Sequence, residues 1–319
     1  MTTHSVKRIV IIGGGPAGYE AALVGARYGA DITLIEDNGL GGSAVIDDCV
    51  PSKSFIAGAN VKTDLRRAED MGLSMKLAGD AAGAGSTKLV TALNSRVQQL
   101  AGKQSSDIHR SVERAGVRII AGRGTFDDHN LNQTVHHIRV EHTDGTVETI
   151  ECDLVLVATG ASPRILPGAQ PDGERIVTWR QIYSITELPE HLIVVGSGVT
   201  GAEFVSAFAE LGVKVTMVAS RDRILPHDDA DAADVLETVL TERGVSLVKH
   251  ARVDSVVRTD DGGVLVCTSD GREIRGSHAL MTVGSIPNTR NMGVETIGIE
   301  TTPSGHIKVD RVSRTNVPG

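Results

Sequence analysis

The order of apolar and polar positions at the start of the chain predicts a strand, a turn, a helix and a second strand. Residues 9–12 form a continuous β-branched run, which is typical of a strand buried on both faces of a parallel sheet. A glycine-rich turn follows, and residues 19–28 then have the composition of an alanine-rich helix. Residues 32–35 form a second apolar run that ends at Glu36. This order predicts a βαβ unit.

The turn of this unit, residues 13–18 with the sequence GGGPAG, has the spacing of a dinucleotide-binding fingerprint. In this motif the first glycine makes a tight turn, the second lets the backbone approach a pyrophosphate, and the third allows close helix–strand packing. The amino end of the helix faces the phosphates, and an acid after the second strand accepts hydrogen bonds from a ribose. We therefore expect Gly13, Gly15, Gly18 and Glu36 to bind a dinucleotide.

A second unit repeats this pattern later in the chain. Residues 192–195 predict a strand, residues 196–201 read GSGVTG, residues 202–211 predict a helix and residues 213–218 another strand. Two dinucleotides held by one chain imply electron transfer between them. The repeat lies at the scale of whole domains, so it does not indicate a solenoid.

The complete pattern predicts the α/β fold class, with two Rossmann-like dinucleotide-binding domains and small antiparallel β insertions. Helices are expected at 54–71, 87–114 and 230–243, single strands at 117–120, 154–157, 280–283 and 307–310, a hairpin of 135–140 with 147–152, and an antiparallel set of 245–248, 251–258, 263–267 and 271–274.

Composition narrows the possible functions. The 319 residues carry a net charge of −8 and only 3% aromatic residues, which argues against a nucleic-acid surface built on basic and stacking side chains. No apolar stretch approaches the length of about 20 residues that a membrane helix needs. The three cysteines lie far apart and form no CxxC pair. We therefore expect neither a metal site nor a secreted disulfide framework, and we expect a cytoplasmic protein.

Residues 39–53, with the sequence GLGGSAVIDDCVPSK, resemble the redox-disulfide segment of the pyridine nucleotide–disulfide oxidoreductases, the family of lipoamide dehydrogenase and glutathione reductase. The family segment contains two cysteines. Cys49 and the Pro-Ser-Lys that follows it match, but Ala44 stands at the first cysteine position. The Ala-Thr-Gly of residues 158–160 and the Gly-x-x-Pro-Asn of residues 284–288 extend the resemblance over nearly the whole chain.

The resemblance implies that the first unit binds FAD and the second binds NADH or NADPH. The expected domains are residues 1–160 for the first part of the FAD-binding domain, 161–283 for the NAD(P)-binding domain, and 284–319 for an incomplete return to the FAD domain. The cofactor-binding residues that it implies are Gly13, Gly15, Pro16, Ala17, Gly18, Glu36, Gly41, Gly42, Lys53, Gly124, Ala158, Thr159, Gly160, Gly196, Gly198, Val199, Gly201, Glu203, Ser220, Arg221 and Gly284.

The resemblance also implies the catalytic residues Lys53 and Glu203. In the family these two pair beside the flavin N5, where a lysine stabilises the anionic reduced flavin and a carboxylate keeps that lysine charged. Cys49 corresponds to the flavin-facing thiol of the family. It is either a reactive thiolate or a packing residue, because Ala44 removes its disulfide partner.

The end of the strand at 213–218 bears on the choice of nicotinamide. An NAD-selective site has an acid there for the ribose 2′-hydroxyl. Here Ala219, Ser220 and Arg221 follow the strand, with Arg223 just after. Guanidinium groups can bind a 2′-phosphate, so we expect NADPH to be accepted, with or without NADH.

The missing thiol favours an acceptor that meets the flavin directly. The segment resembles the NAD(P)H–quinone reductase branch of the lipoamide dehydrogenase-like flavoproteins, so we expect a quinone or a similar small electron acceptor. The alternatives are a dihydrolipoyl dehydrogenase-like activity, a transhydrogenase, or a non-catalytic dinucleotide-binding remnant.

The chain stops before the Gly-Asp flavin motif and the dimerisation domain that the family has. We expect a truncated chain with an incomplete flavin pocket. The resemblance implies a homodimer for full-length members of the family.

Overall fold

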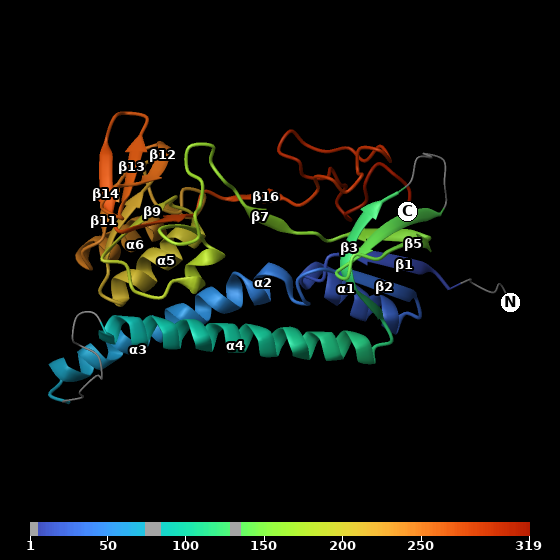
Figure 1. The fold of residues 1–319 in the computed structure, drawn as a ribbon, viewed down its shortest axis with the longest axis horizontal. Coiled ribbons are helices and arrows are strands. Elements are labelled where there is room, and N and C mark those ends of the chain that lie inside the picture. The colour runs from blue at the N-terminus through green and yellow to red at the C-terminus, as the bar shows by residue number, and fades with distance from the viewer. Residues whose placement is uncertain (1–5, 74–83, 128–134) are drawn as a thin grey trace. The chain divides into compact units, whose positions relative to one another are not determined.

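The computed structural model describes residues 6–73, 84–127 and 135–319. The chain divides into two compact units, and Figure 1 labels most of their elements. Unit 1 consists of Met1–Asp47, Ala101–Ser162 and Ile286–Gly319, and unit 2 consists of Asp48–Leu100 and Pro163–Ser285. Each unit contains a parallel sheet with helices. The predicted α/β fold class with two Rossmann-like domains is therefore confirmed.

Unit 1 is built on a six-stranded sheet with the order β5-β4-β3-β2-β1-β6. Strands β3, β2, β1 and β6 run parallel, and β4 and β5 continue the sheet in antiparallel pairing. The elements of this unit are β1 (Arg8–Ile12), α1 (Pro16–Arg27), β2 (Asp31–Glu36), α2 (Gly42–Ile46), β3 (Arg118–Phe126), β4 (His136–His142), β5 (Val147–Cys152) and β6 (Leu154–Val157).

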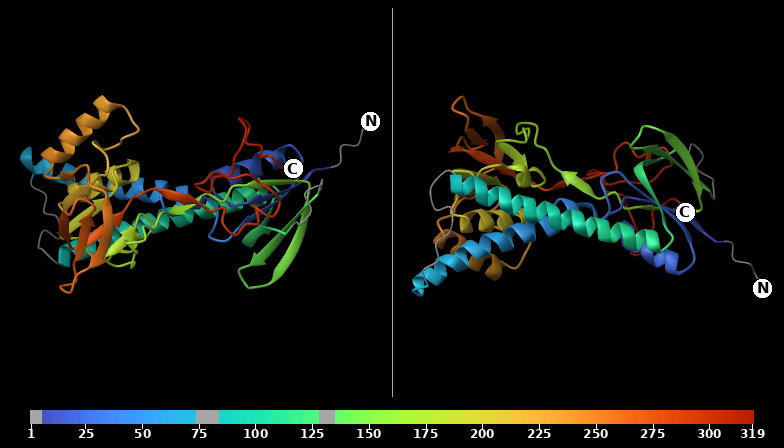
Figure 2. Two further views of the ribbon diagram at one scale, coloured as in Figure 1. Left: turned by 90° about the horizontal axis from the view of Figure 1, so that it is seen from above. Right: turned by 60° about the horizontal axis from the view of Figure 1, so that its bottom comes forward.

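Alternate side chains of β1 enter two different cores, as expected for a strand covered on both faces. Ile11 packs with Ala22 of α1 and with Val112. Val10 and Ile12 pack on the opposite face with apolar residues of β4 and β5 and of the segment 292–299. The ribbon of β4 and β5 thus curls over the face of the sheet opposite α1 (Figure 2).

Unit 2 is built on a five-stranded parallel sheet with the order β11-β10-β9-β15-β8, accompanied by a three-stranded antiparallel sheet β12-β13-β14. The elements of this unit are α3 (Cys49–Asp70), β8 (Ile176–Thr178), the 3₁₀ turn η1 (Gln181–Ser184), β9 (His191–Val195), α5 (Val199–Glu210), β10 (Lys214–Val218), α6 (Ala230–Glu242), β11 (Ser246–Val248), β12 (Val253–Arg258), β13 (Val264–Thr268), β14 (Glu273–Gly276) and β15 (His278–Met281).

The parallel sheet of unit 2 is covered by helices on one face and by the small antiparallel sheet on the other. Leu192 and Val194 of β9 belong to a core that also contains Phe55 of α3 and Phe208 of α5. Ile193, the residue between them, packs instead with residues of β12 and β13. Helix α3 therefore lies on the same face of this sheet as α5, and this placement positions the side chains that α3 carries.

The long helix α4 (Ala84–Arg114) contributes its residues up to Leu100 to unit 2 and the rest to unit 1. The short strands β7 (Ala161–Pro163) and β16 (Ser285–Pro287) pair where the chain passes from one unit to the other. Among the described residues, no helix combines the length and the apolar composition needed to cross a membrane.

Two of the expected elements differ from the structure. Residues 246–248 form β11, which pairs in parallel with β10 as an edge of the main sheet, so the prediction that this run joins the antiparallel set was wrong. The strand expected at 307–310 is reduced to a single bridge between Thr301 and Ile307. Runs this short carry no periodicity that distinguishes a parallel edge strand from a hairpin strand or from an extended loop.

Both fingerprint helices begin earlier than their apolar patterns indicate. Helix α1 begins at Pro16 and α5 begins at Val199, so the last residues of each fingerprint belong to a helix. Proline is favoured at the first helical position, where its missing N–H has no helical partner to lose. Strand β3 likewise continues to Phe126, through two glycines that the apolar pattern does not include.

The expected domains are defined by the cofactor that each part of the chain binds. The division into two compact units rests on packing alone and does not test cofactor binding. Residues 48–100 group with unit 2, because α3 packs on α5. The boundaries 1–160, 161–283 and 284–319 therefore stay a prediction.

Candidate functional site

The first fingerprint forms a turn in which two positions admit only glycine. Gly13 has φ +107°, and a Cβ there would lie 2.3 Å from the carbonyl oxygen of Ala158. A Cβ at Gly18 would lie 1.8 Å from the carbonyl oxygen of Gly13. Gly15 is the N-cap of α1, and no side chain among the described residues caps this helix end. The turn therefore presents the backbone N–H groups of a helix start, which favour an anion.

A second glycine turn lies directly against the first. Gly41 donates its N–H to the carbonyl oxygen of Gly14 over 2.8 Å. Gly42 has φ +55°, and a Cβ there would lie 2.6 Å from Cα of Gly15. The structure thus brings together Gly15, Gly41 and Gly42, the residues expected along a pyrophosphate. A backbone cradle without side chains at the contact fits a group that must be approached closely.

Glu36 closes the other side of this turn. One carboxylate oxygen accepts the N–H of Gly14 over 2.6 Å, and the other accepts the N–H of Asn38 over 2.8 Å. Desolvation raises the pKa of Glu36 and outweighs the two backbone hydrogen bonds, which lower it, while Asp37 raises it further. Gly14, to which the sequence prediction gives no role, is therefore the donor that orients Glu36, the residue predicted to bind the ribose.

Gly124 and the Ala-Thr-Gly segment complete the predicted FAD residues of unit 1. A Cβ at Gly124 would lie 3.1 Å from the side chain of Ile35. The side chain of Asn288 donates to the carbonyl oxygen of Thr159 over 2.9 Å. The backbone N–H of Asn288 donates to the carbonyl oxygen of Gly160 over 3.0 Å. In the sequence Asn288 is only the last residue of the Gly-x-x-Pro-Asn motif, and in the structure it holds the Ala-Thr-Gly segment in place.

The second fingerprint repeats the geometry of the first. Gly196 has φ +116°, and a Cβ there would lie 2.4 Å from the carbonyl oxygen of Thr282. A Cβ at Gly201 would lie 2.3 Å from the carbonyl oxygen of Gly196. No described atom lies within 4 Å of the position of a Cβ at Gly198, which is the N-cap of α5. The start of α5, with Val199 58% exposed, is therefore open to a ligand.

The residues expected to select the nicotinamide cofactor lie in the turn after β10. The carbonyl oxygen of Arg221 accepts the N–H of His250 over 3.1 Å. Asp222, which the sequence prediction did not weigh, lies between Arg221 and Arg223, with its carboxylate 3.8 Å from the Arg223 guanidinium. This acid partly offsets the positive charge that a 2′-phosphate would require. Gly284, the last predicted residue of unit 2, is exposed with φ +88°.

Lys53 of α3 and Glu203 of α5 form an ion pair within unit 2. Lys53 Nζ lies 2.7 Å from Glu203 Oε1, and the side chains are 56% and 22% exposed, respectively. Burial lowers the pKa of Lys53, but the hydrogen bond and the charge of Glu203, helped by Cys49 and Asp48, outweigh it, so this pKa is raised. The ammonium therefore stays charged.

Ser52 belongs to the same cluster, although sequence reasoning assigned it no role. Its Oγ lies 3.3 Å from Glu203 Oε2 and 3.2 Å from Lys53 Nζ. Ser52 is only 1% exposed. The signal in the sequence was its place beside Lys53 in the Pro-Ser-Lys motif.

Aromatic packing fixes the two helices that carry this cluster. The rings of Phe55 in α3 and Phe208 in α5 have centroids 5.3 Å apart. Phe204, which follows Glu203, packs on Tyr183 with centroids 5.9 Å apart. Farther along α3, Lys62 Nζ donates to the carbonyl oxygen of Leu211 over 2.8 Å. These contacts set the register of α3 on α5.

Cys49 is the first residue of α3 and is exposed. Cys49, Cys152 and Cys267 all lie within the described residues, and none of them forms a disulfide. The described residues also contain no group of three or more His, Cys, Asp or Glu side chains that could hold a metal.

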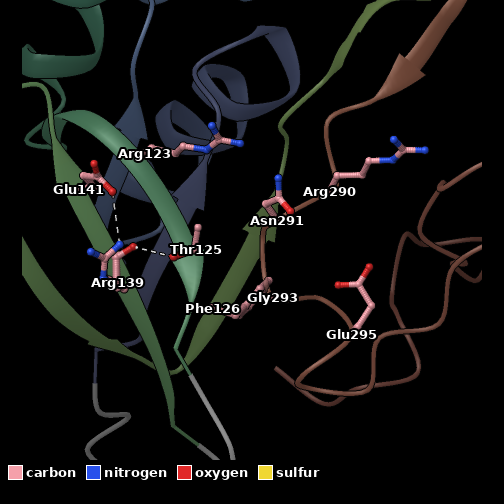
Figure 3. A pocket seen from close by; sticks show the side chains of 9 residues that line it. All are labelled: Arg123, Thr125, Phe126, Arg139, Glu141, Arg290, Asn291, Gly293 and Glu295. Carbon is pink, nitrogen blue, oxygen red and sulfur yellow. Dashed lines mark hydrogen bonds and ion pairs between the residues drawn. The ribbon is translucent and has the colours of Figure 1, made fainter. Parts of the chain in front are cut away.

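One cavity has a wall that includes Arg123 and Thr125, the two neighbours of the predicted cofactor residue Gly124. It has a volume of about 750 Å³ and lies in unit 1, between β3 and β4 on one side and the segment 290–295 on the other (Figure 3). Its walls include the exposed side chains of Arg123 and Arg290, and Arg139 is paired there with Glu141 over 3.5 Å. This open, polar cavity contains none of the predicted site residues.

Comparisons with known proteins agree on one family. The family model for pyridine nucleotide-disulphide oxidoreductases matches residues 7–319. The NAD(P)H dehydrogenase (quinone) of Mycobacterium tuberculosis is 54% identical over 318 residues, which cover 98% of this chain and 63% of that protein. The dihydrolipoyl dehydrogenase of Bacillus subtilis is 31% identical over 310 residues, covering 97% of this chain and 65% of that protein.

Solved structures give the same result. The crystal structure of LpdA from Mycobacterium tuberculosis superposes with a TM-score of 0.90 at 54% identity, covering 98% of this chain and 66% of that chain. The flavoprotein disulfide reductase RclA of Escherichia coli, at 23% identity and a TM-score of 0.78, shares the fold. The chain thus spans less than two thirds of the length of the curated relatives it matches.

Proposed function

Because the chain belongs to the pyridine nucleotide-disulphide oxidoreductase family, we propose that it is an FAD-dependent NAD(P)H dehydrogenase that reduces quinones. In this reaction NADPH or NADH gives up a hydride, and a quinone takes up two electrons and two protons, one of them from solvent, to become a hydroquinone. The name of the 54% identical relative, NAD(P)H dehydrogenase (quinone), supports this acceptor.

The observation that carries this proposal is that Lys53, which lies close in sequence to Cys49, forms an ion pair with Glu203, and that Cys49 has no disulfide partner among the described residues. Cys49 is exposed at the start of α3 and forms no disulfide, and Ala44 occupies the first cysteine position of the family segment, where the partner thiol of Cys49 would stand. A thiol relay needs two cysteines that can reach each other. The charged ammonium of Lys53 remains as the group that can act on a bound redox cofactor.

The residues of unit 1 fit a flavin dinucleotide. A Cβ at Gly42 would lie 2.6 Å from Cα of Gly15, so the backbone there is shaped for close approach. Gly15, Gly41 and Gly42 would hold the pyrophosphate, and Glu36 the adenosine ribose. When bound, FAD supplies a centre that accepts a hydride and releases electrons to the acceptor.

In unit 2, Gly196, Gly198 and Gly201 would hold the nicotinamide dinucleotide at the start of α5. Arg221 would contribute to binding a 2′-phosphate. Lys53 would stabilise negative charge on the reduced flavin, and Glu203 keeps Lys53 protonated. The proposed acceptor is a quinone or a similar small molecule, the proposed compartment is the cytoplasm, and a homodimer is the arrangement that the family resemblance implies for full-length members.

The experiment compares acceptors on one preparation. Purified protein is supplied with FAD, and oxidation of NADPH and NADH is followed alone, with a soluble quinone, and with oxidised lipoamide. Oxidation that depends on both FAD and the quinone supports the proposal. Faster turnover with lipoamide than with quinone would overturn it, and so would a failure of the protein to take up FAD.

The dihydrolipoyl dehydrogenase relatives favour a second candidate, since their identity of about 31% also spans nearly the whole chain. The lipoamide arm of the same experiment tests this candidate directly. The position of Ala44 argues against it, because no second thiol is available to exchange with a substrate disulfide.

A further inference from the structure

Ser52 joins the two charged groups of unit 2 into a closed ring of contacts. Glu203 uses Oε1 for Lys53 Nζ at 2.7 Å and Oε2 for Ser52 Oγ at 3.3 Å. Lys53 Nζ lies 3.2 Å from Ser52 Oγ. Each oxygen of the carboxylate therefore has its own partner, and each of the three groups contacts both others.

The direction of the hydrogen bonds follows from the chemistry of the three groups. An ammonium has only donors, so Ser52 Oγ accepts from Lys53. Its single proton has two possible acceptors, Glu203 Oε2 at 3.3 Å and the carbonyl oxygen of Cys49 at 3.5 Å. The carboxylate is both nearer and charged, and hydrogen bonds to charged acceptors are the stronger ones. Ser52 thus donates to Glu203 while it accepts from Lys53.

We propose that Ser52 is a positioning residue that holds the Lys53–Glu203 pair in one geometry. This inference rests on the proposed function, in which Lys53 acts on the reduced flavin. An ammonium has three protons, and Glu203 and Ser52 take two of them. One N–H of Lys53 is left for a bound ligand, in a direction that the other two contacts fix.

The exposure of the residues shows why the pair needs such support. The Lys53 side chain is 56% exposed, and a lysine side chain is a flexible four-carbon stem with a strongly hydrated end. Ser52 is 1% exposed and sits on the turn of α3 that the Phe55–Phe208 contact anchors to α5. The hydroxyl is therefore the rigid member of the ring.

A simpler role for Ser52 would be to close the first turn of α3. The helix already has a backbone bond there, from the N–H of Ser52 to the carbonyl oxygen of Asp48 over 2.7 Å. A purely helical role would change the stability of α3 and leave the chemistry of Lys53 unaltered. The test must therefore measure the reactivity of the Lys53 amine.

The experiment measures how fast the Lys53 amine is acylated in the protein without cofactors. Only the neutral amine reacts, so the rate over a range of pH reports how well the ammonium is held. The charged and titratable groups that act on Lys53 are Glu203, Cys49 and Asp48. A small amine-acylating reagent is used, and the modified Lys53 peptide is quantified by mass spectrometry.

In Ser52→Ala we expect Lys53 to be acylated about 2- to 10-fold faster than in the wild type, the ratio that corresponds to one net hydrogen bond. Ser52→Thr keeps the hydroxyl and should restore the slow rate. Ser54→Ala is the matched control on the same helix, because the Ser54 hydroxyl makes no hydrogen bond with any described residue. Circular dichroism verifies that each variant is folded.

A double-mutant comparison separates the two roles of Ser52. In the Glu203→Gln background, Ser52→Ala should add much less than it does alone, because the pair that it positions is already weakened. Wild-type acylation in Ser52→Ala would overturn the proposal, and so would effects of Ser52→Ala and Glu203→Gln that multiply independently. The measurement needs neither FAD nor a quinone, so a failed quinone assay leaves this result to stand on its own.

Discussion

Lys53 Nζ lies 2.7 Å from Glu203 Oε1, although the two residues belong to different helices of unit 2. The glutamate is less exposed than the lysine, so the more buried Glu203 carboxylate holds the Lys53 ammonium in place. Exposed ion pairs contribute little to stability, typically about 0–1 kcal/mol. If the pair acts in catalysis as proposed, its removal should affect catalysis more than folding.

Replacing Lys53 by alanine tests this directly. We expect Lys53→Ala to slow reduction of the flavin by NADPH by about 100-fold, the scale seen when one preorganised electrostatic contact is removed from an active site. Stopped-flow absorbance of the flavin band measures the rate. Lys88→Ala is the control, because Lys88 is exposed on α4 and forms no ion pair with any described residue. An unchanged rate in Lys53→Ala would refute the assigned role.

The contact between the two glycine turns of unit 1 predicts a loss of FAD. A Cβ at Gly42 would lie 2.6 Å from Cα of Gly15, and Gly42 has a positive φ. We expect Gly42→Ala to cost about 1–3 kcal/mol of unfolding free energy and to raise the FAD dissociation constant. Urea unfolding and flavin fluorescence measure the two effects.

Gly102→Ala is the matched control for this substitution. Gly102 lies within α4, and apart from its chain neighbours and the backbone of its own helix no described atom is within 4 Å of the position that a Cβ would occupy. Alanine there should stabilise the protein by about 0.5–1 kcal/mol. If both variants retained FAD equally, the proposed cradle would be ruled out.

The turn after β10 predicts the preference between the two nicotinamide cofactors. We expect Arg221→Ala to raise the KM for NADPH by about 10-fold, because a charged hydrogen bond to the 2′-phosphate is lost, and to leave the KM for NADH unchanged. Asp222→Asn should lower the KM for NADPH, since it removes a negative charge beside Arg223. Steady-state kinetics with both cofactors measure these changes.

The control for these two substitutions is Arg252→Ala, because Arg252 is an exposed arginine of unit 2 that lies just before β12. It should change neither KM. Equal effects of Arg221→Ala on NADPH and NADH would show that Arg221 does not read the 2′-phosphate.

A buried histidine predicts how stability depends on pH. His278 is 3% exposed, and its Nε2 lies 3.0 Å from the Arg175 guanidinium. Burial, together with the charge of Arg175, lowers the pKa of His278 from 6.5 to about 4. The folded state thus binds fewer protons than the unfolded state between these values. The contribution of His278 is fully present above pH 6.5 and is lost as the pH falls towards 4.

The size of this effect follows from the pKa difference and amounts to about 3 kcal/mol. Urea unfolding at several values between pH 7 and pH 4 should show the loss, and His278→Gln should remove most of that slope. His109→Gln, at an exposed position on α4, should keep it. A wild-type slope in His278→Gln would contradict the prediction.

Much of the fold was accessible from the sequence because its signals are local. The β-branched run before Gly13 and the run before Gly196 each fix a parallel strand, and the glycine spacing that follows fixes a turn. The positive φ of Gly13 and Gly196 bears out that reading of the turns. The edge strand β11 was misassigned because its partner β10 is identified only by tertiary pairing.

The sequence predicts those residues of the candidate site that belong to a recognisable motif. Lys53 and Glu203 were paired by resemblance, and the distance between them gives that pairing a physical basis. The supporting residues were missed for a common reason. Ser52, Gly14 and Asn288 act through hydrogen bonds to other segments, and no periodicity in a single chain reveals which distant group a serine or an asparagine will contact.

The segment 292–299 has a consequence for how the protein is made. Met292, Val294, Ile297 and Ile299 cover the face of the first sheet that Val10 and Ile12 present. A ribosome produces those two strand residues early and the covering segment only after the whole of unit 2 has been translated. Until the segment 292–299 is synthesised, the first sheet of the nascent chain exposes apolar surface. Exposed apolar surface promotes aggregation. We expect production of this protein to depend on chaperones that shield that face until the segment arrives.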